Sequence, residues 1–208
     1  MRSNESSGTQ PEAHTPAKIA CFAAGTLIKT QDGPVAIEEL EIGDMVHTVD
    51  SHVQPIQWIG KVHLRRGGTQ AAIRIAAGAL GECCPERDLL VSPNHRMVIS
   101  GWRAEALFGQ DEVLVCASDL VNDHSIRQEP SEDPVTYYHF MFEKHEIVES
   151  NGAPSESFHP GRVPVAELDS QIREELFNLF PDLTDDVAAY GCAARISVDA
   201  SGARALVE

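Results

Sequence analysis

The stretch AKIACFAAGTLIKT, residues 17–30, marks the point where the chain changes from polar to patterned. Cys21 follows a polar leader and comes directly before the small-residue segment AAGT and the β-prone run TLIKT. A single cysteine in a protein usually behaves as a small buried hydrophobe. Here it stands at the head of the first predicted strand, and this position needs an explanation.

Short β-prone runs follow, separated by Gly, Pro and Asp turn signals. This texture predicts a mostly-β domain, since no strand–helix–strand rhythm and no internal repeat is present. The runs are TLIKT, MVHTVD, PIQWIGKVHL, AAIRIAA, DLLVSPNHRMVIS, EVLVCASDLV and TYYHFMFEKHEIVES.

Three segments are expected from the change in texture along the chain. Residues 1–18 are rich in Ser, Glu, Thr and Pro and are expected to be a disordered leader or passenger. Residues 19–163 form the β domain. Residues 164–208 begin with PVAELDSQIREELFNLFPDL, in which Leu168, Ile172 and Leu176 recur at helical spacing. They are expected to form a helical extension that packs on the domain.

Composition excludes several classes of partner. The net charge is −16, from 32 acidic and 16 basic residues. Nucleic acid is not expected as a partner, because no excess of basic residues is present to release counterions from phosphates. No apolar run reaches the roughly 20 residues that a membrane-spanning helix needs.

The expected compartment is less narrowly defined. The N-terminus has no apolar segment of the kind that marks a secretory signal. The five cysteines are scattered and odd in number, which is typical of a reducing compartment rather than of a disulfide framework. The protein is expected to be soluble, and either cytoplasmic or exported without a cleaved signal peptide.

Four pieces of sequence carry residues that could act chemically. Each is weak alone, because a lone histidine on an apolar strand is usually a core residue. The pieces are Cys21 in CFAAGT, Ser92 and His95 in LLVSPNHRMVI, His139 and His145 in TYYHFMFEKHEIV, and Asn151 and His159 in SNGAPSESFHPG.

In this order the pieces resemble the Hint superfamily, the fold shared by hedgehog C-terminal domains, inteins and bacterial intein-like proteins. EELEIGDMVHTVD is similar to the family segment that follows the nucleophile, and SPNH is similar to its Thr-x-x-His block, with Ser92 in the Thr position. FEKHEIV followed by SNG looks like the C-terminal block. The resemblance covers residues 19–162 and is closest to bacterial intein-like Hint domains. It implies an all-β, horseshoe-like fold, here with a C-terminal helix.

The resemblance also implies a self-processing reaction, for which the residue types are suitable. The Cys21 thiol can attack the carbonyl carbon of Ala20 through a five-membered ring, so that the attack is intramolecular. The product is a thioester in place of the Ala20–Cys21 amide. The protein's own N-terminal segment would be the substrate, and no cofactor is expected.

Histidines and a hydroxyl would assist this acyl shift. His95 is the candidate for protonating the leaving nitrogen, and Ser92 for binding the strained amide or the oxyanion. Since thiolate is the nucleophilic form, His139 or His145 would take the thiol proton.

The far end of the domain departs from the splicing pattern. In SFHPG, His159 matches the penultimate His, but Pro160 stands where a splicing intein has Asn. Asn151 and Gly152 could replace it by succinimide formation, although Asn-Gly is also the strongest short turn signal. Full splicing is therefore not expected. N-terminal cleavage, or transfer to an external thiol, amine or water, remains.

Two other function classes stay open. One is an inactive Hint-like module that serves in binding or assembly. The other is a Cys–His protease acting in trans through Cys21, His95 and His139. A metal site made of His139, His145 and His159 is not expected, because their spacings match no tight ligand motif.

Overall fold

The computed structural model describes residues 20–64, 71–129, 134–162, 170–184 and 186–207. The expected leader and the beginning of the expected C-terminal helix lie outside the described residues. The strands are β1 (Phe22–Ala23), β2 (Leu27–Thr30), β3 (Gly33–Ala36), β4 (Met45–Thr48), β5 (His52–Pro55), β6 (Trp58–Leu64), β7 (Ile73–Ile75), β8 (Leu89–Val91), β9 (Arg96–Ser100), β10 (Glu112–Cys116), β11 (Ile126–Gln128), β12 (Val135–Met141), β13 (Ile147–Ser150) and β14 (Ala153–Glu156). The α-helices are α1 (Trp102–Phe108), α2 (Ser170–Leu179) and α3 (Ala200–Val207).

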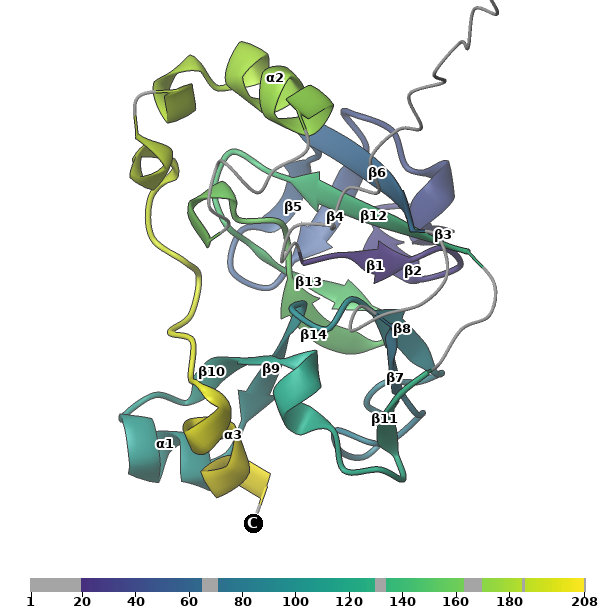
Figure 1. Ribbon diagram of the computed structural model, residues 1–208, viewed down its shortest axis with the longest axis vertical. Helices are drawn as coiled ribbons and strands as arrows, with labels where there is room; N and C mark the ends of the chain where they lie inside the picture. The colour runs from purple at the N-terminus through teal and green to yellow at the C-terminus, as the bar shows by residue number, and fades with distance from the viewer. Residues whose placement is uncertain (1–19, 65–70, 130–133, 163–169, 185, 208) are drawn as a thin grey trace, which may run out of the picture.

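The strands form two antiparallel sheets, as the mostly-β prediction requires (Figure 1). The six-stranded sheet has the order β11-β7-β8-β1-β12-β6. The eight-stranded sheet has the order β10-β9-β14-β13-β2-β4-β5, with β3 paired to β2. Strands rich in Val, Ile and aromatic residues suit this arrangement, since each packs one face on a shared core.

The two-residue strand β1 occupies the middle of the six-stranded sheet. Phe22 pairs with Val91 of β8 on one side and with Tyr138 of β12 on the other. Because both pairings are antiparallel, the residue before Phe22 lies beside the residues that follow Val91 and Tyr138. The register therefore brings Cys21 between Ser92 and His139.

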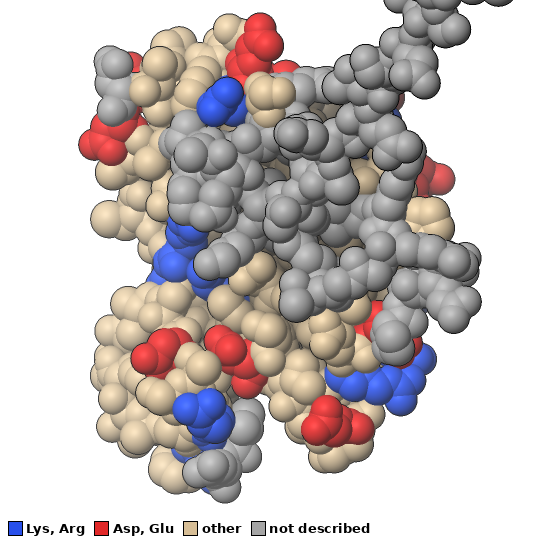
Figure 2. Space-filling view, in the orientation of Figure 1, with Lys and Arg blue, Asp and Glu red and all other residues tan. Residues whose placement is uncertain are grey.

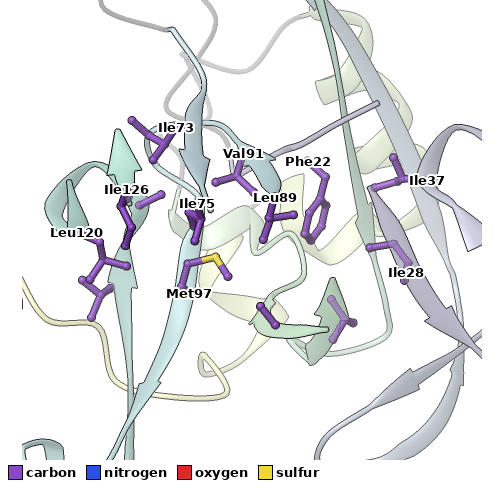
Figure 3. Close-up of a cluster of buried hydrophobic side chains, with 14 of the residues drawn as sticks. Phe22, Ile28, Ile37, Ile73, Ile75, Leu89, Val91, Met97, Leu120 and Ile126 are labelled. Atoms are coloured by element: carbon purple, nitrogen blue, oxygen red, sulfur yellow. The ribbon is translucent and has the colours of Figure 1, made fainter. Parts of the chain in front are cut away.

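The main apolar core lies between the sheets. Phe22 belongs to it and is 1 % exposed. In the view of Figure 3 its ring lies between Leu89 of β8 and Ile28 of β2, which belong to the same cluster. Burying a side chain of this size contributes about 1.5–3 kcal/mol, so that Phe22 anchors the short strand that carries Cys21.

The C-terminal segment runs the length of the molecule (Figure 1). Helix α2 packs on β6, and its Leu176 is fully buried in a second apolar cluster that contains Cys21. The Tyr190 hydroxyl donates to the Phe142 carbonyl oxygen at 2.9 Å. Further on, α3 packs beside α1 at the opposite end of the molecule.

Charged side chains are dispersed over the visible surface. On the face shown in Figure 2, the basic side chains of the described residues lie in small groups among acidic ones. Among the described helices, none has both the length and the apolar character needed to cross a bilayer.

Asn151 and Gly152 form the two-residue turn between β13 and β14, where Ser150 pairs with Ala153. Their φ angles are 47° and 81°, as a type I′ hairpin turn requires. The Asn151 Oδ1 accepts the Leu27 N–H at 2.7 Å, and its Nδ2 donates to the Asp88 carbonyl oxygen at 2.9 Å. In the structure the Asn151 side chain thus links this turn by hydrogen bonds to Leu27 and to Asp88.

Replacing Asn151 by alanine is expected to lower the free energy of unfolding by about 2–4 kcal/mol, since a partly buried donor and acceptor lose their partners and alanine tolerates positive φ poorly. Asn151→Gly, the matched control, keeps the backbone freedom and is expected to lose about 1 kcal/mol less. Urea denaturation measures both. Equal stability of wild type and Asn151→Ala would contradict this structural role.

Candidate functional site

Two hydrogen bonds hold the backbone of Cys21. The Cys21 N–H donates to the Ser92 Oγ at 2.9 Å, and the Ser92 N–H donates to the Cys21 carbonyl oxygen at 2.9 Å. Cys21 is 5 % exposed and Ala20 is 9 % exposed, so that the peptide bond between them is largely shielded from water. The Ser92 hydroxyl is therefore bound to the nitrogen of the Ala20–Cys21 peptide bond.

His139 lies against the thiol of the same residue. Its Nδ1 is 3.4 Å from the Cys21 Sγ. Burial lowers the pKa of His139 to about 3. Burial also raises the pKa of the Cys21 thiol far above its usual value, although a hydrogen bond with Ser92 opposes this shift. The resting pair is consequently a neutral thiol beside a neutral imidazole.

His95 follows Ser92 in a tight turn, where the His95 N–H donates to the Ser92 carbonyl oxygen at 3.0 Å. Its ring is fully buried and packs on Phe22, with 4.3 Å between ring centroids. Neither ring nitrogen has a hydrogen-bond partner among the described residues. Burial lowers the pKa of His95 to about 4, against the raising effect of the Glu156 charge. His95 is thus a neutral imidazole next to the segment that binds Cys21.

His145 lies elsewhere and is engaged at both nitrogens. Its Nδ1 accepts the Ala194 N–H at 3.0 Å, and its Nε2 lies 3.1 Å from the Ser157 carbonyl oxygen. An Nδ1 that accepts carries no proton, so that the ring proton is on Nε2. Of the two histidines considered as acceptors of the thiol proton, the structure places His139 at the sulfur.

His159 neighbours His145 rather than Cys21. The centroids of the two imidazole rings are 5.0 Å apart, and the Tyr190 ring lies 5.1 Å away on another side. The His159 Nδ1 accepts the Gly161 N–H at 3.1 Å, and burial lowers its pKa to about 4. Pro160 begins a short 3₁₀ turn directly after it. With Asn151 in the β13–β14 turn, the two residues of the expected C-terminal block have separate surroundings.

Sequence reasoning missed the residues that surround the His139 ring. Trp58 and Phe158 pack on it, with centroids 5.0 Å and 5.5 Å away. The Trp58 Nε1–H donates to Glu175 Oε2 of α2 at 3.3 Å. The only signal in the sequence was the tryptophan and glycine of QWIG, which also fit an ordinary strand.

Within the ranges that the structure describes, no three His, Cys, Asp or Glu side chains are grouped so that they could hold a metal ion. Around Cys21 the structure brings together a thiol, the His139 imidazole at that thiol, and the Ser92 hydroxyl at the adjoining peptide nitrogen.

Comparison with known families decides the identity of this domain. The family model described as the Hint domain matches residues 20–162. The chain belongs to the Hint domain family. The match begins at the residue before Cys21, and it ends before α2 and α3, so that these helices lie outside the matched Hint region.

Solved structures similar to this Hint domain are inteins and intein-like domains. A bacterial intein-like domain from Clostridium thermocellum is 17% identical, with a TM-score of 0.46, and covers 66% of this chain and 97% of that one. The AceL NrdHF class 3 split intein is 19% identical, with a TM-score of 0.45 and the same coverages. The MchDnaB-1 intein is 12% identical, with a TM-score of 0.44, and covers 65% of this chain and 98% of that one. No curated protein matches the chain.

The burial of His95 predicts how the stability of the fold depends on pH. An unfolded histidine binds a proton below about pH 6.5, but His95 does so in the fold only near pH 4, so that the unfolded state binds more protons between these values. Stability is therefore expected to fall as pH falls through this window. His95→Gln is expected to reduce the slope of unfolding free energy against pH by up to about 1.4 kcal/mol per unit.

Urea unfolding of wild type and His95→Gln between pH 4.5 and 7.5 measures this difference. The comparison concerns the slope, so that a constant loss of stability in the variant does not affect it. Identical slopes would contradict a buried, neutral His95.

Proposed function

We propose that this Hint domain breaks the peptide bond between Ala20 and Cys21 by an N-to-S acyl shift. The observation that carries the proposal is that Cys21 has a partner side chain at each of the two atoms that it brings to the reaction, its backbone nitrogen and its sulfur. The Ser92 hydroxyl binds the nitrogen of that bond, while His139 lies at the sulfur of the same cysteine. In the proposed organisation, residues 1–18 are the leader, residues 19–163 the processing domain, and residues 164–208 an extension packed on it.

In the proposed reaction the Cys21 sulfur attacks the carbonyl carbon of Ala20. A carbon–sulfur bond forms, and the thiol proton passes to His139 Nδ1. The carbon–nitrogen bond then breaks, and the nitrogen, whose N–H is bound to Ser92, gains a second proton and becomes an amine. In the proposal that proton is the one released by the thiol. It passes from the protonated His139 to the nitrogen by way of His95, which gives up one ring proton and regains another, so that both imidazoles end neutral.

The buried environment fits a reaction in which charge exists only briefly. Since the thiol and both imidazoles are neutral at rest, the thiol loses its proton only as the attack proceeds. The lack of a preformed thiolate is offset because the nucleophile and the carbonyl carbon belong to adjacent residues. An intramolecular attack of this kind is worth several powers of ten in effective concentration. An external thiol, amine or water then takes the acyl group and releases residues 1–20.

Wild-type protein treated with dithiothreitol or hydroxylamine is expected to lose residues 1–20, and Cys21→Ala is expected to remain intact, because it lacks the nucleophile. Intact-mass spectrometry over time measures both. Cys192→Ala, which removes an exposed cysteine, is the matched control and should react like wild type. A wild-type mass that stays unchanged after prolonged incubation with strong thiols would refute the proposed function.

Ser92→Ala is expected to slow thiol-induced cleavage by about 10²–10³-fold, the usual effect of removing one hydrogen-bonding group from a reacting centre. Ser92→Thr retains the hydroxyl and is expected to stay within about tenfold of wild type on the same argument. Quenched time points analysed by mass give the rates, and circular dichroism checks the fold. Equal rates for the alanine and threonine variants would exclude a role for the hydroxyl.

A second candidate is a Hint domain that keeps the bond intact and serves in binding or assembly. The burial of the Cys21 thiol and the absence of hydrogen-bond partners for His95 among the described residues favour it. An intact leader under all conditions, together with a co-purifying partner, would support this function. A protease acting in trans fits less well, since Cys21, which is only 5 % exposed, offers little access to another chain.

A further inference from the structure

We propose that Gly60 is a positioning residue for His139. The missing side chain at position 60 provides the space in which the imidazole of His139 turns its Nδ1 to the Cys21 sulfur. The inference rests on the proposed function, in which His139 takes the thiol proton, and it extends the reacting site to a strand that carries no reactive group.

The strand register places Gly60 directly beside His139. In the pairing of β12 with β6, His139 is opposite Gly60, and Met141 is opposite Trp58. A Cβ built on Gly60 would lie 2.4 Å from the His139 Nε2. It would also lie 2.5 Å and 2.7 Å from the Cη2 and Cζ2 atoms of Trp58. Since Cβ atoms do not approach other atoms so closely, both rings occupy the space that a side chain at position 60 would need.

The other sides of the imidazole are closed by aromatic rings. Trp58 and Phe158 pack on it and on each other, and they are 1 % and 2 % exposed. The hydrogen bond from Trp58 to Glu175 ties the indole to α2. A side chain at position 60 would therefore push His139 while Trp58 and Phe158 leave it little room to yield.

Packing, rather than a second hydrogen bond, must orient this ring. A functional histidine commonly has its second nitrogen bound to a carboxylate or a carbonyl group, which sets its orientation. The His139 Nε2 is buried and has no hydrogen-bond partner among the described residues. The contact between Nδ1 and Sγ is thus the only hydrogen bond found for this ring within the described residues, and the bare backbone of Gly60 permits it.

Backbone conformation does not explain the glycine. The φ angle of Gly60 lies outside the left-handed region, so that alanine could adopt it. Glycine inside a strand weakens it by comparison with a residue that has a side chain to pack. Space for the two rings is the explanation that the contacts supply.

A double-mutant cycle tests the proposal with Gly60→Ala, His139→Ala and the double variant. Two rates are measured: thiol-induced cleavage by intact mass, and alkylation of Cys21 by iodoacetamide without added thiol, resolved by peptide mass spectrometry. Gly60→Ala is expected to lower both rates by about 10²-fold, the lower end of the effect of general acid–base catalysis. In the His139→Ala background, the added Cβ still meets Trp58, but it is expected to change the two rates less than about twofold, because no imidazole remains to be moved away from the Cys21 sulfur.

Gly202→Ala is the matched control. Its added Cβ would also be crowded, 3.0 Å from the Phe108 Cζ, but it lies in α3, away from Cys21. Both rates are expected to stay at the wild-type level. Should Gly60→Ala not fold by circular dichroism, it is combined with Trp58→Phe throughout the cycle, because this removes the indole atoms that stand over position 60 and leaves the contact of the added Cβ with His139.

The outcomes separate this proposal from the proposed function. Additive effects of the two substitutions on alkylation, or an alkylation rate that Gly60→Ala leaves unchanged, would overturn the positioning role. If wild type is not cleaved but alkylation shows the expected coupling, the positioning role holds and the proposed function fails.

Discussion

The site depends on the insertion of a two-residue strand, β1, between β8 and β12. Phe22 is paired on both sides, and its buried ring anchors the strand in the main core. The two antiparallel registers then leave no freedom for the preceding residue. Cys21 must lie beside Ser92 and His139, and the hydrogen bonds at its nitrogen and sulfur follow from that placement.

Burial decides the electrostatics of the same place. Cys21, His95 and His139 are all removed from water, and each pKa moves in the direction that favours the neutral form. The resting site therefore holds no ion pair between the thiol and His139. In the proposed acyl shift, the proximity of the thiol to the adjoining carbonyl carbon would take the place of a preformed thiolate.

Residues beyond the matched Hint region complete the surroundings of the buried histidines. Glu175 of α2 accepts from Trp58, which packs on His139. Ala194 donates to the Nδ1 of His145 and so selects the tautomer of that ring. The C-terminal segment thus contacts the environment of two histidines of the domain, in addition to packing on its apolar surface.

The sequence by itself determined the features that depend on near neighbours. Alternating β-prone runs predicted the mostly-β fold, and the ordered pieces around Cys21 and His95 predicted the Hint family, because both patterns are written in short segments. Only the tertiary structure decided between His139 and His145 at the thiol, since that choice depends on strand register. Gly60 and Trp58 were hidden for the same reason: their contact with His139 arises from the pairing of β6 with β12, and no local pattern encodes which side chain a strand will face.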